Sequence, residues 1–403
     1  MLLGISITNF SVFDNDKVGI LLDDLSSADK DPFLTISAGL TPAIPLSNLM
    51  ALIGRNSSGK TSFFGALSFV SDCTNMGCAA ASIEHGRFGF VHLLTEQGKP
   101  MAFEFLFQLK NGHESGTGPE DIIVSYRMEL DADEHGKPFY ASEKVIRSRK
   151  TEDGSWDRLV CLDLVNGEGT VICGGERIRG GVSDTRFSAL RSYGALVSCP
   201  LLHALNHEIT HWFFCDFSSE FRRTGNGVAP GGHKHLNCDG SNLENVLEYI
   251  RAENPVQYPE IIERITEKIP NIGKESHKLP ASFKKSPGKL FLYLLLLEDP
   301  MPRPLICIET PDIGLYHDMV DVLATEFRQY SIRHPYSQII FTTHNPYILE
   351  SMAPGEVWIF KRVEEDAENL VDIDCAGADP VVAEMYRQGV GLGAIWYSGH
   401  FDD

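Results

Sequence analysis

The sequence lacks paired cysteines, long hydrophobic segments and a secretory signal. Its nine cysteines include no C-x-x-C pair, and scattered cysteines in a long chain are typical of a reduced, cytoplasmic protein. The longest apolar run, LFLYLLLL at 290–297, is much shorter than the roughly 20 residues that cross a bilayer. The opening MLLGISITNF lacks the basic and extended apolar regions of a signal peptide. We therefore expect a cytoplasmic location and no membrane partner.

The sequence also lacks an excess of positive charge. Lys and Arg number 35 against 55 Asp and Glu, which gives a net charge of −20. Because phosphate contacts need clustered cations, we do not expect broad, non-specific DNA binding. The lysine-rich segment 274–289 and the basic residues at 147–150 leave a local groove for nucleic acid open. Hydrophobic residues make up 43% of the chain, which is enough for a full core.

The first half of the chain divides into two patterns. In residues 1–75, the stretches LGISITNFSVF and KVGILLDDL are predicted strands, and an apolar strand, NLMALIG, precedes a helical pattern. We interpret this segment as the N-terminal part of an α/β core. In residues 76–184, alternating stretches are separated by Gly-, Asp- and Glu-rich turns, which predicts an inserted antiparallel sheet.

The second half of the chain first shows hydrophobic residues at helical spacing and then an alternation of predicted helices and strands. Residues 185–280 are predicted to form a helical lobe, in which Ser241 and Glu244 have the spacing of a capping box. Residues 281–403 alternate helix and strand, which predicts a parallel α/β arrangement and the C-terminal part of the same core. No long heptad pattern exists, so an extended coiled-coil arm is not expected.

The segment GRNSSGKT at 54–61 carries the strongest chemical signal. It matches G-x-x-x-x-G-K-[ST] after a predicted strand and at the start of a predicted helix. Glycines let the backbone wrap phosphates, while free N–H groups supply positive potential. We expect Lys60 to reach the β- and γ-phosphates of ATP and the Thr61 hydroxyl to bind Mg²⁺. The predicted nucleotide-binding residues here are Gly54, Arg55, Asn56, Ser57, Ser58, Gly59, Lys60, Thr61 and Ser62.

Two later strands end in residues that suit a nucleotide site. LICIE ends at Glu309, which is expected to hold the Mg²⁺ shell, usually through water. IIFTTH ends at His344 and is predicted to be the neighbouring parallel strand, so His344 can point at the γ-phosphate region. Either signal is weak alone, because many strands end in Glu and a lone His is usually structural. Their order after a phosphate-binding loop makes them candidate catalytic residues.

These motifs, in this order, resemble one family. ITNFSVF, NLMALIGRNSSGKTSFFGAL, LICIETPDIGLYHDM and TTHNPYIL resemble the opening strand, the Walker A segment, the Walker B segment with D-loop, and the H-loop of the RecF/SMC/OLD-like branch of ABC ATPases. The resemblance implies an α/β ABC-ATPase head with a mixed or parallel P-loop core sheet, an antiparallel β insertion and a helical lobe. In such a head, residues 1–75 and 281–403 would be the N-terminal and C-terminal parts of the ATPase core. It also implies a homodimer that sandwiches ATP, or a higher homo-oligomer built from such dimers.

In this family a signature loop of one head completes the ATP site of the other. FKKSPGKLFLYLLLL resembles that loop, so Ser286 and Gly288 are expected near the γ-phosphate bound by a second copy. The alternative is an ordinary Ser-Pro helix start. The lysines of 274–289 form either a solvated face or a further contact with phosphate or a partner.

Position 310 departs from the family pattern. The resemblance puts a water-activating carboxylate there, but the residue is Thr310, whose hydroxyl is no general base near neutral pH. Asp312 lies two residues further on in the D-loop and is a poor geometric substitute. We therefore expect tight binding of ATP and Mg²⁺ with slow hydrolysis at a centre of Glu309, Thr310 and His344. The alternative is a base supplied elsewhere, by His344 or by a partner.

The C-terminal segment bears on function. LGAIWYSGHFDD resembles the end of bacterial "AAA family ATPase" proteins of defence-type operons, where a small nuclease or toxin-like effector is often encoded alongside. The chain ends soon after the H-loop strand, so we expect no nuclease domain. The first hypothesis is a sensor and regulator of an antiphage defence system that controls a separate effector. The alternatives are a RecF-like repair or recombination ATPase that binds DNA on ATP-driven dimer closure, and a non-enzymatic ATP-binding scaffold.

One further cluster has residue types that can bind a metal. His233, His235, Cys238 and Asp239 lie close together in GGHKHLNCDG, which is compatible with a zinc clip. The spacing is loose and no second ligand pair matches it, so a surface loop is the favoured interpretation.

Overall fold

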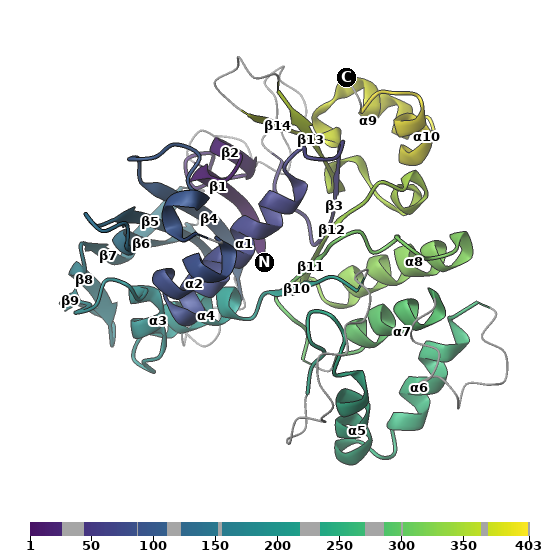
Figure 1. The fold of residues 1–403 in the computed structure, drawn as a ribbon, viewed down its shortest axis with the longest axis horizontal. Helices are drawn as coiled ribbons and strands as arrows, with labels where there is room; N and C mark the ends of the chain where they lie inside the picture. The colour runs from purple at the N-terminus through teal and green to yellow at the C-terminus, as the bar shows by residue number, and fades with distance from the viewer. Residues whose placement is uncertain are drawn as a thin grey trace. The chain divides into compact units, whose positions relative to one another are not determined.

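The computed structural model describes residues 1–25, 44–86, 88–110, 122–151, 155–217, 234–270, 286–299, 301–363 and 370–401. The chain forms two compact units, each assembled from segments that are distant in sequence (Figure 1). Unit 1 comprises Met1–Ser47, Gly54–Trp212 and Trp358–Pro380, and unit 2 comprises Asn48–Ile53, Phe213–Val357 and Val381–Asp403.

Unit 1 is built on an antiparallel sheet of eight strands in the order β2-β1-β4-β5-β6-β7-β8-β9. The strands are β1 Leu2–Phe10, β2 Phe13–Gly19, β4 Met101–Leu109, β5 Ile122–Ala132, β6 Pro138–Lys150, β7 Trp156–Val165, β8 Glu168–Cys173 and β9 Glu176–Gly181. The predicted antiparallel sheet is confirmed, and the first hairpin of the chain is part of it because β1 pairs with β4.

The first two predicted strands are wrong in their bounds. LGISITNFSVF is not one strand, because the chain reverses at Ser11 and Val12 and Phe10 pairs with Phe13. Ser11 adopts a positive φ of 57°, a turn conformation that apolar alternation does not reveal. Asn9 is also at φ 57°, and its buried side-chain amide donates to the carbonyls of Glu96 and Lys99 at 3.0 and 2.8 Å.

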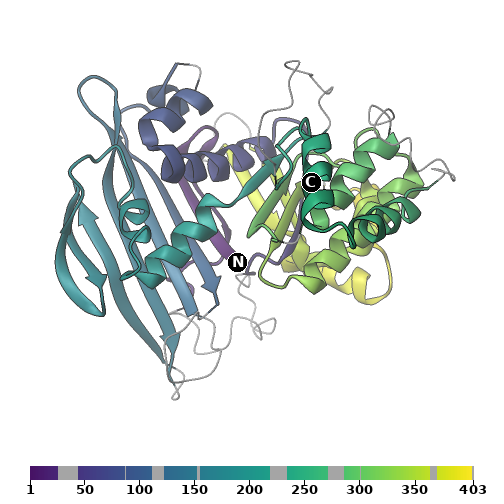
Figure 2. The same cartoon turned by 90° about the horizontal axis from the view of Figure 1, so that it is seen from below.

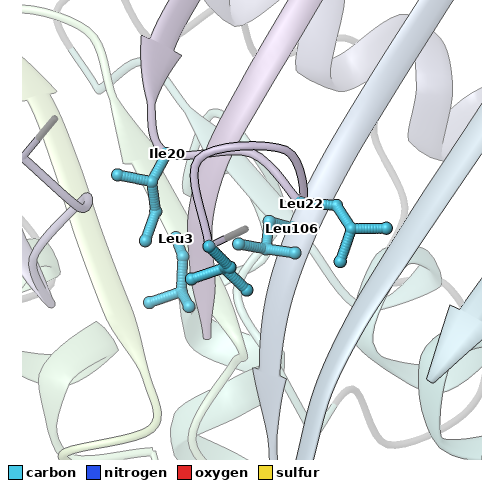
Figure 3. Packing of buried hydrophobic residues seen from close by; sticks show 5 residues of the cluster. Leu3, Ile20, Leu22 and Leu106 are labelled. Atoms are coloured by element: carbon cyan, nitrogen blue, oxygen red, sulfur yellow. The ribbon is translucent and has the colours of Figure 1, made fainter. Parts of the chain in front are cut away.

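The second predicted strand ends early for a packing reason. β2 stops at Gly19, whose φ of 87° turns the chain. The following Leu22 and Leu25 are buried with Leu3, Ile20 and Leu106 in one apolar cluster (Figure 3). These leucines therefore fold back onto the sheet rather than extend it.

Four helices and a short 3₁₀ turn accompany this sheet in unit 1 (Figure 2). They are α1 Lys60–Met76, α2 Cys78–His85, η1 Phe90–Leu93, α3 Ala189–Gly194 and α4 Pro200–Thr210. Phe69 of α1 packs against Phe10 and Phe103 of the sheet, with ring centroids 5.5 and 6.2 Å apart. The antiparallel pair β13 (Val357–Arg362) and β14 (Val371–Cys375) also contributes to this unit.

Unit 2 contains four parallel strands in the order β10-β11-β12-β3. They are β10 Phe213–Cys215, β11 Leu305–Ile308, β12 Gln338–Thr342 and β3 Leu49–Ile53. All residues of β3, β11 and β12 are buried, as expected for parallel strands covered on both faces. The predicted parallel arrangement is confirmed. β10 was not predicted, because it lies within the predicted helical lobe and a strand of three residues is too short to show an alternating hydrophobic pattern.

The helices of unit 2 follow the predicted pattern with one correction. They include α5 Leu243–Glu253, α6 Tyr258–Glu267, α7 Ser286–Leu297, α8 His317–Arg333, η3 Pro346–Ser351, η4 Pro354–Glu356 and α10 Leu392–Tyr397, while α9 Pro380–Arg387 begins at the unit boundary and η5 Ala376–Ala378 lies in unit 1. The capping box at Ser241 is wrong, since Asn242 is the N-cap of α5. The Asn242 side chain instead fixes the preceding loop through Asn237 and His235. Within the described ranges, no helix is long and apolar enough to span a membrane.

Candidate nucleotide-binding site

The predicted phosphate loop in unit 1 has the backbone conformation of an anion-binding turn. Gly54, Ser57 and Gly59 adopt φ values of 133°, 64° and 104°, and α1 begins directly after Gly59. Alternation of left- and right-handed residues directs successive N–H groups to one side, where an anion can be held. An added Cβ at Gly54 would lie 2.1 Å from the carbonyl oxygen of Phe360, so this position tolerates only glycine.

Lys60 holds the loop together. Its side chain is 6% exposed, and Nζ donates to the carbonyls of Gly54 and Arg55, both at 2.8 Å. The Ser58 hydroxyl lies 3.4 Å away. Since the ammonium is already surrounded by oxygen acceptors, the loop offers a charge-assisted donor in a fixed place.

The other predicted residues of the loop differ in their solvent exposure. Ser58 and Gly59 are buried and Gly54 is half-buried. Ser62 is also half-buried and accepts from the Ser11 hydroxyl at 3.3 Å. The exposed members of the set are Arg55, Asn56, Ser57 and Thr61. The loop therefore keeps its lysine inside, while Thr61, the predicted Mg²⁺ ligand, is an exposed residue.

Gly54→Ala is expected to destabilise the protein by more than about 1 kcal/mol and to remove nucleotide binding, because Ala at a positive φ is strained and its methyl group meets a backbone carbonyl. Gly65→Ala in α1 is the matched control, because its added Cβ has no neighbour within 4 Å. Thermal unfolding and equilibrium dialysis with ATP measure both effects. Equal behaviour of the two variants would contradict the role of Gly54.

In unit 2, the strand ends bring the other predicted motifs to one edge. Leu52 of β3 is opposite Thr342, and Phe341 is opposite Ile308. Because the strands are parallel, the residues that follow them leave the sheet at its carboxyl edge. Glu309 and His344 emerge there as predicted, and Gly54 follows β3 directly in the chain. Glu309 is half-buried, whereas His344 is exposed.

Thr310 has an unusual backbone. Its φ is 42°, a rare value for a β-branched residue. Its N–H donates to the Thr342 hydroxyl at 2.9 Å, and its carbonyl accepts from Ile313 at 3.2 Å. The position next to Glu309 is thus fixed by the neighbouring strand and by the turn that follows.

Two residues that the sequence did not assign to the site join three of its motifs. Lys289, next to Gly288 at the start of α7, donates to the carbonyl of Ile313 in the D-loop. Asp312 in the same loop accepts from the Thr343 hydroxyl at 2.9 Å, directly before His344. Burial raises the pKa of Asp312 and lowers the pKa of Lys289, so both charges are partly desolvated. In the sequence, the indication that Lys289 and Asp312 belong to the site is that each lies close to a predicted motif residue.

The signature segment is only partly within the described residues. α7 begins at Ser286, and Gly288 is buried. The lysines that precede Ser286 in 274–285 lie outside the described residues. Ser286 and Gly288 lie in the first turn of a 12-residue helix, whose free N–H groups favour an anion.

The donor set fits Mg²⁺. The predicted ligands, a threonine hydroxyl and a carboxylate, are oxygen donors of the kind that Mg²⁺ prefers together with water and phosphate oxygens. The described residues hold no group of three His, Cys, Asp or Glu side chains arranged for a metal.

The histidine-rich cluster has a different arrangement from a zinc clip. His235 Nδ1 lies 2.6 Å from Asp299 Oδ2, and Cys238 is exposed. His233 lies outside the described residues. His235 and Asp299 also line a cavity of about 260 Å³ with α5 and α6, and none of the predicted nucleotide-binding residues lines it.

Comparisons with known proteins agree with these motifs. Residues 49–161 and 288–350 match the family described as "AAA domain, putative AbiEii toxin, Type IV TA system". No curated protein matches the chain. Among solved structures, an SMC head bound to the C-winged helix domain of ScpA is 15% identical, with a TM-score of 0.46 and coverage of 93% of this chain and 98% of that chain.

Two further SMC heads show the same range of similarity. The SMC head domain from Thermotoga maritima is 12% identical, with a TM-score of 0.37 over 93% of this chain and 98% of that one. An Smc head derived from Pyrococcus furiosus, bound to the C-terminal domain of ScpA, is 13% identical, with a TM-score of 0.37 over 96% and 99%.

The matched segments contain the residues on which the site depends. Residues 49–161 include the phosphate loop, and 288–350 include Glu309 and His344. The strands that precede these motifs are parallel neighbours in unit 2. The chain is thus similar to this AAA family over the segments that carry its nucleotide motifs, and these motifs resemble those of the SMC/RecF-like branch of the ABC ATPases.

Proposed function

We propose that this ATPase dimerises around ATP and regulates a separately encoded effector of an antiphage defence system. The observation that carries the proposal is the conformation of the phosphate loop, in which three residues with positive φ surround the buried Lys60. A loop built this way at the start of a 17-residue helix suits a triphosphate. In the proposed complex, Lys60 exchanges its carbonyl partners for phosphate oxygens, and Thr61 and Glu309 complete the Mg²⁺ shell.

The position of the signature segment supports the proposed dimerisation. Ser286 and Gly288 lie in the first turn of α7, and Lys289 ties that turn to the D-loop through Ile313. In the proposed ATP-bound state, the α7 N-terminus of one copy contacts the γ-phosphate held by the other. A link between signature turn and D-loop would let each copy respond to the nucleotide of its partner.

The regulatory role rests on slow hydrolysis and on the family. Thr310 stands where a base is needed, so ATP would act mainly to hold two heads closed. The matching family is described as a putative toxin of a type IV toxin–antitoxin system, which supports a place in a bacterial defence-type module in the cytoplasm. Control of a separate nuclease or toxin is the function proposed for the closed dimer.

Lys60→Ala is expected to weaken ATP binding roughly 10–100-fold, the value of one to two charge-assisted hydrogen bonds, and to abolish ATP-dependent dimers. Isothermal titration and sedimentation with ATP and Mg²⁺ measure the two effects. Lys144→Ala is a matched control, since Lys144 is a half-exposed lysine of β6 paired with Asp163 at 3.4 Å.

The outcome separates the proposal from its alternative. A Lys60→Ala protein that binds ATP as tightly as the parent would overturn nucleotide binding through this loop. Strong, ATP-dependent binding of plain duplex DNA that weakens with salt would favour the RecF-like repair function over regulation of an effector.

A further inference from the structure

A pair of cysteines in unit 1 lies far along the chain from every nucleotide motif. Cys173 ends β8, and Cys199 is the N-cap of α4. Their sulfur atoms are 3.0 Å apart, although both cysteines are free thiols. In a disulfide the two sulfur atoms are about 2.05 Å apart, and the bond forms between side chains that already approach closely. A small side-chain rotation is therefore enough to join Cys173 and Cys199.

Backbone contacts hold the two cysteines in this position. Gly174 and Gly175 form a two-residue hairpin turn with φ values of 60° and 85°, and Cys173 pairs with Glu176 across it. The N–H of Gly174 donates to the carbonyl of Ser198 at 2.7 Å. The tight turn and this hydrogen bond keep the loop before α4 against the end of β8.

The two thiols differ in the way that a redox pair requires. Cys173 is half-buried, and its sulfur lies 2.8 Å from the Ser198 hydroxyl. Hydrogen bonds from Ser198 and Cys199 hold the pKa of Cys173 below its usual range. Cys199 is 2% exposed, and burial, together with Cys173, raises its pKa to about 11. The accessible thiol is therefore the more acidic one.

We propose that Cys173 and Cys199 form a reversible disulfide when the protein meets hydrogen peroxide. The Cys173 thiolate attacks one peroxide oxygen, so an S–O bond forms, the O–O bond breaks, and the leaving hydroxide is protonated to water. The Cys199 sulfur then attacks the Cys173 sulfur: the S–S bond forms, the S–O bond breaks, and the second hydroxide takes the Cys199 proton. Two thiols and one peroxide give one disulfide and two waters.

The disulfide braces α4 at its N-terminus. The other end of α4 contacts α1, since the Ser71 hydroxyl donates to the carbonyl of Ile209 at 2.9 Å, and α1 begins at Lys60. Oxidation therefore fixes α4, which supports α1, the helix that follows the phosphate loop. In a reducing compartment, a disulfide of this kind is a transient sensor rather than a permanent link.

The test treats the reduced full-length protein with hydrogen peroxide and maps its peptides without reduction. The expected product is a cross-link between the peptides of Cys173 and Cys199 that dithiothreitol reverses, with Tm raised by about 5–10 °C in the oxidised form. Cys199→Ser is expected to stop at a sulfenic acid on Cys173 that dimedone labels. Cys173→Ser should show neither product.

Cys238→Ser is the matched control, because Cys238 is exposed but belongs to no such pair; it should behave like the parent. A peroxide-treated parent without the 173–199 cross-link would overturn the proposal, and that result does not depend on whether any variant folds. Absence of dimedone labelling in a folded Cys199→Ser protein would overturn the assignment of Cys173 as the attacking thiol.

Discussion

Thr310→Glu is expected to raise the rate of ATP hydrolysis roughly 10²–10⁴-fold, the usual contribution of a general base. Thr310 follows Glu309 at the end of β11, where the resemblance to the family places the water-activating carboxylate. Its backbone N–H is fixed by the Thr342 hydroxyl at 2.9 Å, a contact that any residue except proline can make. The new side chain would therefore start from a Cα held in the same place.

The backbone of Thr310 also affects how this variant should be controlled. At φ 42° a β-branched residue is strained by about 1–2 kcal/mol, so an unbranched replacement should not cost stability. Thr310→Gln has the size of Glu without the base and should hydrolyse ATP as slowly as the parent. Single-turnover hydrolysis at saturating ATP and Mg²⁺ measures all three proteins.

Two results would reject slow hydrolysis caused by Thr310. One is rapid turnover by the parent that Glu does not change. The other is equal acceleration by Gln and Glu, which would point to relief of strain. If the parent is fast and His344→Ala is slow, then His344, which lies exposed at the same sheet edge, supplies the base.

Glu143→Leu is expected to lower the free energy of unfolding by about 3–5 kcal/mol, because it leaves several buried donors without an acceptor. Glu143 is 3% exposed on β6. It accepts from the Tyr126 hydroxyl at 2.9 Å and the Ser188 hydroxyl at 2.7 Å. The backbone N–H groups of Ala189 and Leu190 at the start of α3 also donate to it. These N–H groups have no partner within the helix.

Denaturant unfolding at neutral pH measures the effect, and Glu129→Leu provides the control. Glu129 lies on the adjacent strand β5, with a side chain 30% exposed and an ion pair of 4.0 Å to Arg127. Its replacement should change the free energy of unfolding by less than about 0.5 kcal/mol. Similar losses in the two variants would show that Glu143 does not cap α3.

The same residue predicts a pH dependence. Burial raises the pKa of Glu143 above its ordinary value of 4.5, although its donors oppose the shift. The folded protein thus holds this proton more tightly than the unfolded chain. The parent should gain stability relative to Glu143→Gln as the pH falls from neutral through the raised pKa toward 4.5. A stability difference that is constant with pH would contradict the raised pKa.

Much of the fold could be predicted from local patterns. The alternating segments after residue 100 predict β4 to β7, and the apolar runs at 49–53, 305–308 and 338–342 predict the buried parallel strands. The failures have local causes. The turn at Ser11 interrupts an alternation that continues on both sides, and β10 is too short to show a period.

The residues of the candidate site were predictable where chemistry fixes their spacing. A phosphate loop needs its glycines and Lys60 within eight positions, so GRNSSGKT is recognisable in any sequence context. Lys289 and Asp312 do not belong to such a pattern. Their contacts with Ile313 and Thr343 join segments that are 24 and 31 residues apart. Such contacts cannot be predicted from the spacing of residues in the sequence.

The sequence by itself determined the motifs, their order and the strands that precede them, because backbone conformation and hydrophobic period act over a few residues. Only the tertiary structure decided that Glu143 caps α3, that the Asn9 side chain binds the carbonyl of Lys99, and that Cys173 and Cys199 bring their sulfur atoms to 3.0 Å. These contacts join residues between 26 and about 90 positions apart. Their existence depends on how strands and helices pack, and packing is a property of the folded chain as a whole.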